Sequence, residues 1–114
     1  STAGLIGAPQ LALMKKTAIL INVARAALID EEALYSALRE KRIGGAALDV
    51  WYKYPSASGP TRPSSCPFHE LDNVLLTPHI AGWTDGMLEA RSALMAENIG
   101  LVAKGLSPRN VIPI

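Results

Sequence analysis

Three short apolar runs punctuate the chain, at residues 18–23, 46–50 and 73–77. Each is rich in Val, Ile, Leu or Ala and shows little alternation with polar residues. Runs of this length and composition are typical of strands that are buried on both faces of a parallel sheet. The pattern therefore predicts three such strands.

One helical pattern lies before the first run, and another lies between the first run and the second. A short stretch containing Leu11, Leu13 and Met14 precedes two lysines, and Pro9 suits a first helical turn. Asp30 then stands as an N-cap, followed by an apolar stripe at helical spacing. The stripe consists of Ala33, Leu34, Ala37 and Leu38. We expect this helix to end at Lys41 and Arg42, with the glycines at 44 and 45 as its stop signal.

The last third of the chain predicts a long helix. Thr84 or Asp85 is the expected N-cap, apolar residues recur at sevens up to Lys104, and Gly105 ends the helix. Residues 54–67 differ in kind, because they hold four prolines, four serines and a glycine and so predict a loop or extended arm. The order helix, strand, helix, strand, arm, strand, helix predicts one α/β domain with a parallel sheet and right-handed crossovers.

Composition narrows the class. Of the 114 residues 49% are hydrophobic and 18% charged, which fits a globular domain, and the net charge of +1 gives no sign of a nucleic-acid or membrane partner. A single cysteine cannot form an internal disulfide, and no signal peptide pattern opens the chain. By default we expect a cytoplasmic protein.

Chemistry-bearing residues follow each predicted strand. Arg25 lies beyond the first run, Asp49 at the end of the second and His79 beyond the third. In doubly wound sheets, ligands bind beyond the carboxyl ends of the strands. A guanidinium matches a carboxylate, an imidazole exchanges a proton near neutral pH, and a carboxylate accepts amide hydrogen bonds. The pattern therefore favours a shared active site at this edge.

Each of these residues also has a simpler interpretation. An arginine after a strand is usually a solvated charge, a histidine after Thr-Pro can fill a turn, and an aspartate at a strand end often caps the next turn. The residues alone leave both interpretations open.

Around these positions the sequence resembles the D-isomer-specific 2-hydroxyacid dehydrogenases, the family of phosphoglycerate dehydrogenase and glyoxylate/hydroxypyruvate reductases. The stretches that carry the resemblance are 5–7, 13–15, 18–25, 28–34, 46–50, 72–82 and Thr84, in the family's order. The resemblance implies a partial Rossmann-like domain, the second half of a doubly wound NAD(P)-binding domain. Residues 84–114 would form the helix and tail that return toward a substrate domain.

The resemblance also implies roles. Arg25 would bind the carboxylate of a small 2-hydroxy or 2-keto acid, and His79 would be the general acid/base. Asp49 would hold the carboxamide of the nicotinamide. The small neighbouring residues would lie against the nicotinamide and its ribose: Val23, Ala24, Ala81 and Gly82. The glycine-rich phosphate turn of such domains is absent, since Gly4 and Gly7 follow no strand and have the wrong spacing. An isolated chain is therefore expected to be inactive, and NAD cannot be told from NADP.

Two positions depart from the family. Ala26 replaces the glycine that usually follows the arginine, a small change if the backbone dihedral angles suit alanine. Tyr54 stands before Pro55, where the family carries a glutamate that pairs with the catalytic histidine. A phenol can hydrogen-bond an imidazole but cannot stabilise imidazolium as a carboxylate does. We expect the chemistry to persist with an altered pH range or substrate, and Glu70 or Asp72 are weaker candidates for the missing carboxylate.

Other interpretations remain in competition. The protein could be a weakened relative that binds a nucleotide as a sensor, or a structural α/β module. Aromatic residues gather on the arm at Trp51, Tyr52 and Tyr54, and relatives pair through this domain, so we expect a homodimer. Cys66 and His69 are too few to predict a metal site.

Overall fold

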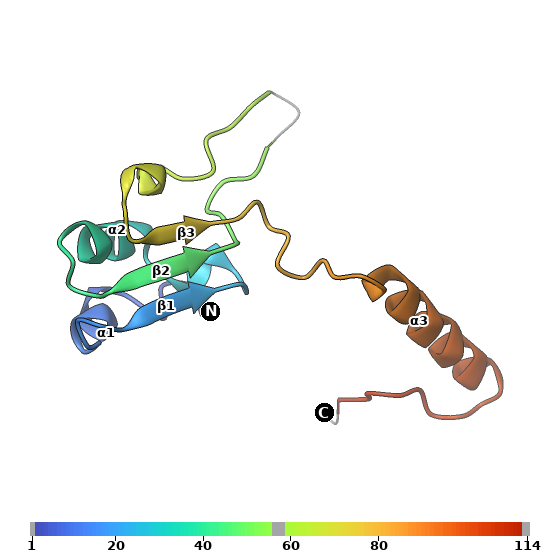
Figure 1. Ribbon diagram of the computed structural model, residues 1–114. Coiled ribbons are helices and arrows are strands. Elements are labelled where there is room, and N and C mark those ends of the chain that lie inside the picture. The colour runs from blue at the N-terminus through green and yellow to red at the C-terminus, as the bar shows by residue number, and fades with distance from the viewer. Residues whose placement is uncertain (1, 56–58, 113–114) are drawn as a thin grey trace. The chain divides into compact units, whose positions relative to one another are not determined.

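Three parallel strands form one sheet in the order β1-β2-β3 (Figure 1). They are β1 (Ile19–Asn22), β2 (Gly45–Leu48) and β3 (Val74–Leu76). The register aligns Ile21 with Ala47 and Ala47 with Leu75. The computed structural model, which describes residues 2–55 and 59–112, thus confirms a partial parallel α/β sheet with a C-terminal helix.

The helices occur in the predicted order, joined by two 3-10 helices. They are α1 (Ala8–Ala12), η1 (Ala26–Leu28), α2 (Glu31–Arg39), η2 (Phe68–Glu70) and α3 (Met87–Ala103). Asp30 is the N-cap of α2, as predicted, since its side chain accepts the N–H of Ala33 at 2.8 Å. Pro9 lies in the first turn of α1, also as predicted.

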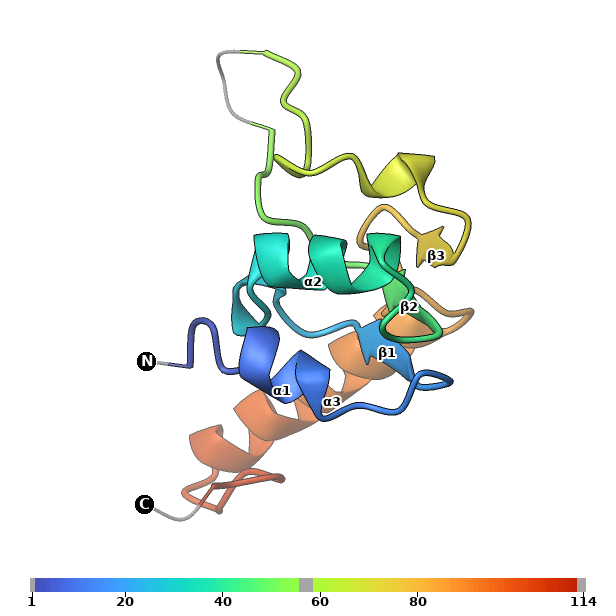
Figure 2. The ribbon, with the colours of Figure 1, turned by 90° about the vertical axis from the view of Figure 1, so that its left-hand side faces the viewer.

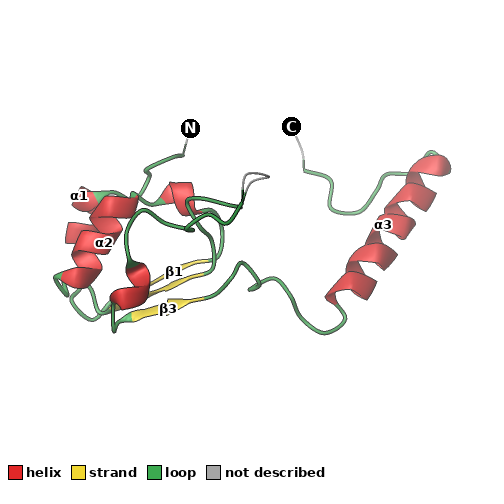
Figure 3. Ribbon diagram, turned by 90° about the horizontal axis from the view of Figure 1, so that it is seen from above, coloured by secondary structure: helices red, strands yellow, loops and turns green. Residues whose placement is uncertain are grey.

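The core lies between the sheet and the two short helices. Helices α1 and α2 lie on the same side of the strands (Figures 2 and 3). Leu11, Leu34 and Leu48 are buried between these layers, and Phe68 of η2 joins them. The ring of Phe68 meets Tyr35 edge-on, with centroids 5.4 Å apart. Residues far apart in sequence, from α1 to η2, therefore close one core against this face of the sheet.

The opposite face of the sheet differs from the prediction. Ile19, Ile21 and Leu75 project to this face, and all three side chains are exposed. The prediction that the strands are buried on both faces is therefore wrong for β1 and β3, whereas β2 is buried or half-buried along its length. The reason is that α1 and α2 both lie on one side, so alternate residues of each strand meet a helix layer while the others do not.

The end of α2 also corrects the sequence analysis. The helix ends at Arg39, and Lys41 takes the left-handed conformation with φ 52°. Gly44 and Gly45 are not its stop signal. They lie where two backbone segments approach closely. A Cβ at position 45 would come 2.6 Å from the carbonyl oxygen of Asn73. Glycine at this position lets β2 and β3 pair.

Helix α3 belongs to a second unit. The described chain divides into Ser1–Ala81 and Gly82–Ile114. The predicted caps Thr84 and Asp85 are wrong, since Gly86 is the N-cap, with φ 76°. Gly105 does end the helix, with φ 72°. Arg109 turns the tail back onto the helix through an ion pair with Glu97 at 2.8 Å. No helix in the described ranges has the length and apolar character needed to cross a membrane.

Candidate active site at the carboxyl edge of the sheet

The loop after β1 is organised by Asn22, the last residue of that strand. Its side chain is buried, and its Oδ1 accepts the N–H of Ala24 at 3.1 Å while its Nδ2 donates to the carbonyl of Arg25 at 3.1 Å. The asparagine therefore folds the turn that presents Arg25. Sequence reasoning assigned no role to Asn22, although an asparagine that ends a strand is a known turn former.

Arg25 itself is exposed. Its Nη1 donates to the carbonyl oxygen of Ala24 at 2.7 Å, and its guanidinium makes no other hydrogen bond or ion pair within the described residues. Ala26 is buried without a positive φ, so alanine fits the position where glycine is usual, as expected. The guanidinium thus keeps most of its donors for a ligand.

The loop after β3 is organised by Asp49, from the neighbouring strand. Its buried carboxylate accepts three hydrogen bonds, from Thr77 Oγ1 at 2.6 Å, Ile80 N at 2.8 Å and Ala81 N at 2.9 Å. Burial alone would raise the pKa of Asp49, but these three bonds and the nearby His79 outweigh it and hold the pKa below its usual value. Asp49 therefore clamps the loop as a carboxylate.

His79 lies inside this clamp. Its φ is 60°, in the left-handed region that costs a residue with a Cβ about 1 kcal/mol or more. The bonds from Thr77 on one side and from Ile80 and Ala81 on the other hold the backbone there. Trp51 adds a further restraint, since its Nε1–H donates to the carbonyl of Thr77 at 3.0 Å. Sequence reasoning missed the roles of Thr77 and Trp51, because the bonds of Thr77 to Asp49 and of Trp51 to Thr77 join distant parts of the sequence.

Tyr54 contacts the imidazole directly. Its Oη lies 3.0 Å from His79 Nδ1, and the two rings are tilted by 48° with centroids 5.6 Å apart. The backbone N–H of Trp51 donates to the same phenol oxygen at 3.4 Å. The other candidates for a partner are engaged elsewhere, Glu70 with His69 at 3.9 Å and Asp72 with Lys41 at 2.8 Å. Tyr54 is therefore the partner of the histidine.

Three of the four groups at this edge are joined and one stands apart. Tyr54 bonds the ring of His79, and Asp49 bonds the backbone of Ile80, the next residue, so all three act on the loop after β3. Arg25 follows β1, with β2 between, and no contact joins it to His79 in the described residues. Because the strands are parallel, both residues follow carboxyl ends along the same edge of the sheet.

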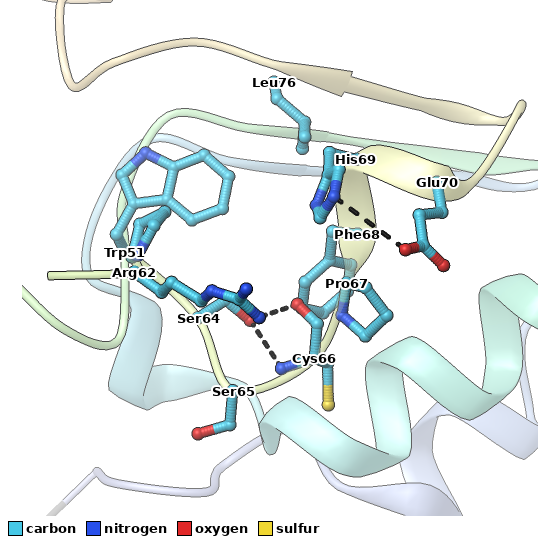
Figure 4. A pocket seen from close by; sticks show the side chains of 11 residues that line it. Trp51, Arg62, Ser64, Ser65, Cys66, Pro67, Phe68, His69, Glu70 and Leu76 are labelled. Carbon is cyan, nitrogen blue, oxygen red and sulfur yellow. Dashed lines mark hydrogen bonds and ion pairs between the residues drawn. The ribbon is translucent and has the colours of Figure 1, made fainter.

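Two hollows flank Trp51 on the arm side. One, of about 720 Å³, is lined by Trp51, Lys53, Tyr54 and His79 among others. The second, of about 450 Å³, lies between the arm and η2, where Figure 4 shows Arg62 and His69 reaching in beside Phe68.

The arm is tied down at its return to the core. Glu31 Oε1 accepts the hydroxyl of Ser64 at 2.5 Å and the N–H of Cys66 at 3.2 Å. Burial, and then the carboxylate of Glu31, raise the pKa of the Cys66 thiol, so this cysteine is a poor nucleophile. The described residues hold no cluster of three metal-ligating side chains.

Whether these residues fit a nicotinamide dinucleotide depends on which part of it is considered. Val23, Ala24 and Ala81 are exposed and mostly small, and Val23 and Ala24 line a hollow of about 300 Å³, which suits a flat ring. The phosphates would not fit at the start of α2, the helix that follows the loop of Arg25 in the described part of the chain. The N-terminus of α2 carries Asp30, Glu31 and Glu32, so it repels an anion. Gly82 is the first residue of the second unit, so its place beside the nicotinamide stays a prediction.

Comparison with known proteins adds the family context. Residues 1–81 match the model of the D-isomer specific 2-hydroxyacid dehydrogenase, NAD binding domain. D-3-phosphoglycerate dehydrogenase of Methanocaldococcus jannaschii is 44% identical over 111 residues, covering 97% of this chain and 20% of that protein. Glyoxylate reductase of Thermofilum pendens is 44% identical over 107 residues, covering 94% of this chain and 30% of that protein. The chain therefore spans only a minor part of the length of these relatives.

Solved structures agree in fold. A D-isomer specific 2-hydroxyacid dehydrogenase from Lactobacillus delbrueckii ssp. bulgaricus, in an NAD complex, superposes with a TM-score of 0.80 at 34% identity. That match covers 98% of this chain and 36% of the other. An acyclic imino acid reductase in complex with NADPH and D-Arg gives a TM-score of 0.79 at 38% identity, covering 98% of this chain and 33% of the other.

Proposed function

Since this chain belongs to the D-isomer specific 2-hydroxyacid dehydrogenase family, we propose that the intact protein containing it transfers hydride between NAD or NADP and a small D-2-hydroxy or 2-keto acid. The observation that carries the proposal is the clamped pair of His79 and Tyr54 on the edge where Arg25 keeps its donors open. An acid/base group and a carboxylate-binding group on one edge are what this reaction needs.

Arg25 binds the substrate carboxylate in this proposal. Its planar fork of N–H donors matches two carboxylate oxygens, and among the described residues it bonds the adjacent carbonyl of Ala24 alone. The turn built by Asn22 sets the direction of its backbone. His79 exchanges the proton of the substrate hydroxyl through its Nε2, because Nδ1 faces Tyr54.

A nicotinamide cofactor, when bound, would accept or supply the hydride. Val23, Ala24, Ala81 and Gly82 are the residues we assign to the nicotinamide and its ribose. Asp49 is assigned to the carboxamide. Its carboxylate accepts three hydrogen bonds from the loop and has room for about one more. The pyrophosphate falls to residues outside this chain, so the isolated chain is expected to be inactive.

A second function rests on Tyr54. Because a phenol replaces the usual carboxylate beside the histidine, the protein could bind the nucleotide as a sensor with little or no turnover. Nucleotide titration without turnover of any keto acid favours this alternative, and keto-acid-dependent consumption of NADH excludes it.

Consumption of NADH or NADPH by the intact protein tests the proposal. Glyoxylate, hydroxypyruvate and pyruvate are the substrates, and turnover of at least one is expected. His79→Gln should lower kcat by about 100- to 10,000-fold, the usual contribution of a general acid/base. Arg25→Lys should raise KM by about tenfold or more, because an ammonium loses the bidentate fit.

Matched controls exist for both variants. His69→Gln changes the other histidine, which is exposed on η2, and Arg39→Lys changes an arginine stacked on Tyr35. Neither should alter kcat or KM beyond about twofold. If the variants at 79 and 25 behave like these controls, the assignment of the site is wrong.

Three wider expectations belong to the same proposal. Residues 84–114 are assigned to the helix and tail that return toward a substrate domain, the intact protein is expected to be a homodimer, and we place it in the cytoplasm. Sedimentation of the intact protein at micromolar concentration should show a dimer, and a monomer alone would contradict that part.

A further inference from the structure

Two contacts meet at the phenol oxygen of Tyr54. The backbone N–H of Trp51, which can only donate, lies 3.4 Å from Oη, and Nδ1 of His79 lies 3.0 Å from it. A phenol oxygen carries a single hydrogen and accepts through its lone pairs. Because Trp51 occupies one acceptor position, the phenol can donate its hydrogen to Nδ1 and keep the bond from Trp51. No other acceptor for this hydrogen lies within bonding distance among the described residues.

This arrangement selects one form of His79. A neutral imidazole carries its hydrogen on one nitrogen and accepts with the other. When Tyr54 donates to Nδ1, the hydrogen of the ring lies on Nε2. In imidazolium, Nδ1 would become a donor and the phenolic hydrogen would lose this acceptor. Tyr54 therefore favours neutral His79 with Nε2–H, whereas a carboxylate at the same place would favour imidazolium.

We propose that Tyr54, acting through His79, is the proton source for reduction of the keto acid, so that neutral His79 relays a proton instead of supplying one from imidazolium. This proposal rests on the proposed function and names how its acid/base step works. The phenol and the imidazole are at the surface of the chain, Tyr54 being half exposed, so water can reach the pair after each turnover.

The step balances in atoms and electrons. As the carbonyl carbon of the keto acid gains a hydride from reduced nicotinamide, the C=O π pair moves to oxygen, which bonds to the hydrogen of His79 Nε2. The N–H pair returns to the ring, and Nδ1 takes the phenolic hydrogen of Tyr54. The phenolate that remains accepts the N–H of Trp51. After the product leaves, Nε2 takes a proton from water and Nδ1 returns its hydrogen to Tyr54.

The other charged groups near the imidazole have opposite effects on its protonation. Asp49 lies beneath the loop, and its negative charge attracts a protonated His79. Its oxygens bond Thr77, Ile80 and Ala81 and do not bond the ring. Lys53 lines the same hollow as Tyr54 and His79, and its positive charge acts against imidazolium. Among the described residues, Tyr54 alone hydrogen-bonds the ring, so its contact is the one on which the proposal rests.

The first test needs no cofactor. Nitrogen NMR of the ¹⁵N-histidine-labelled intact protein, at a pH about two units above the normal titration of imidazole, reports which nitrogen of His79 carries hydrogen. We expect hydrogen on Nε2, with Nδ1 as an acceptor, and loss of this preference in Tyr54→Phe. Hydrogen on Nδ1 in the parent protein would overturn the relay even if the enzyme is active.

The second test is the pH profile of kcat for keto-acid reduction. The parent should stay nearly flat from about pH 6 to 8.5, because neutral His79 is the working form. Tyr54→Phe must draw on imidazolium, so its kcat should fall steadily as pH rises, reaching a loss of about 100-fold relative to the parent at pH 8.5. At pH 6 the loss should be less than tenfold.

Tyr35→Phe is the matched control, since the hydroxyl of Tyr35 lies on α2 and its ring packs on Phe68. It should keep the parental profile. A loss in Tyr54→Phe that is equal at every pH means that Tyr54 only positions His79, and this overturns the relay. An intact protein that reduces no keto acid overturns both the relay and the proposed function, whereas an active enzyme with the wrong tautomer overturns the relay alone.

Discussion

The loop that carries Arg25 and the loop that carries His79 are stabilised in the same way, but by hydrogen bonds of different sequence separation. Each is held by a buried polar side chain at the end of a strand. Asn22 bonds residues two and three positions ahead in its own loop, so its effect is local. Asp49 bonds residues 28 to 32 positions ahead, across to the next strand, and does so with a charge.

The difference corresponds to different tasks. His79 is fixed before any ligand arrives, because its backbone is held at φ 60° and its ring is bonded to Tyr54. Arg25 has a fixed backbone but an exposed side chain that, in the part of the chain the structure describes, bonds only its neighbouring carbonyl. A group that passes a proton needs a defined direction, whereas a group that captures an anion can close upon it.

The largest effect should come from Asp49→Asn, which breaks the His79 loop. The amide group keeps the shape but replaces one acceptor oxygen with an NH₂ donor. At least one of the three loop donors then faces another donor and loses its hydrogen bond. We expect kcat/KM for keto-acid reduction to fall about 100-fold or more, comparable to loss of the acid/base group. Faster hydrogen exchange at Ile80 and Ala81 should accompany it.

The control for this variant is Asp30→Asn, because asparagine also caps a helix well. It should leave kcat/KM within about twofold of the parent. Parental activity in Asp49→Asn would mean that the clamp does not matter to His79, and the contrast between the two loops would then fail.

Asn22→Ala should have a smaller effect, confined to the Arg25 loop. Two buried hydrogen bonds are lost, at a cost of about 1–3 kcal/mol in the free energy of unfolding. We expect KM for the keto acid to rise about tenfold with kcat nearly unchanged, because ground-state and transition-state binding of the carboxylate suffer equally.

Asn73→Ala is its matched control, since Asn73 also holds a backbone carbonyl, that of Leu38, but just before β3 and so at the opposite end of that strand from the His79 loop. It should lose similar stability and keep the parental KM. If Asn22→Ala lowers kcat and leaves KM alone, Arg25 does not bind the substrate in the manner proposed.

Trp51→Phe should be milder. The carbonyl of Thr77 loses the indole donor, while the backbone N–H that reaches Tyr54 is kept. The free energy of unfolding should fall by about 1 kcal/mol, and kcat should change by less than about fivefold. Denaturant unfolding measures the first and keto-acid reduction the second, and a loss of kcat as large as that of Asp49→Asn would show that Trp51 is the main restraint.

The smallest effect is expected from moderate acid. The pKa of Asp49 is lowered in the folded protein, so its bonds add stability above the unfolded pKa and lose it as pH falls through the folded value. Amide protection of Ile80 and Ala81, corrected for intrinsic exchange, should therefore stay constant from pH 8 to 5 and decline only below about pH 4. A decline already at pH 6 would place the controlling titration elsewhere.

Local signals carried much of the sequence analysis. The strands, the Asp30 cap and the stop at Gly105 follow from residues within a few positions of each other, and the structure has them. The failures involve distant partners. Gly45 looked like a helix stop, but a glycine is required there by the carbonyl of Asn73, which directly precedes β3. The exposed face of Ile19 and Ile21 depends on which side the helices take, which no strand pattern encodes.

The candidate site divides in the same way. Arg25, Asp49 and His79 could be named from their places after strands, and Tyr54 from its place in a motif. The partnership of Tyr54 with His79 was a possibility in sequence and is a contact in space, at 3.0 Å. Thr77 and Trp51 were missed, because their bonds to Asp49 and to the loop span 26 or more residues and leave no periodic trace.

The most direct measurement is a crystal structure of the intact protein with reduced nicotinamide dinucleotide and oxamate, an unreactive analogue of a 2-keto acid. The account predicts that the guanidinium of Arg25 bonds the carboxylate of oxamate and that Nε2 of His79 lies within hydrogen-bond distance of its carbonyl oxygen. If ordered oxamate contacts only one of these side chains, or neither, then Arg25 and His79 do not serve one substrate and the account is contradicted.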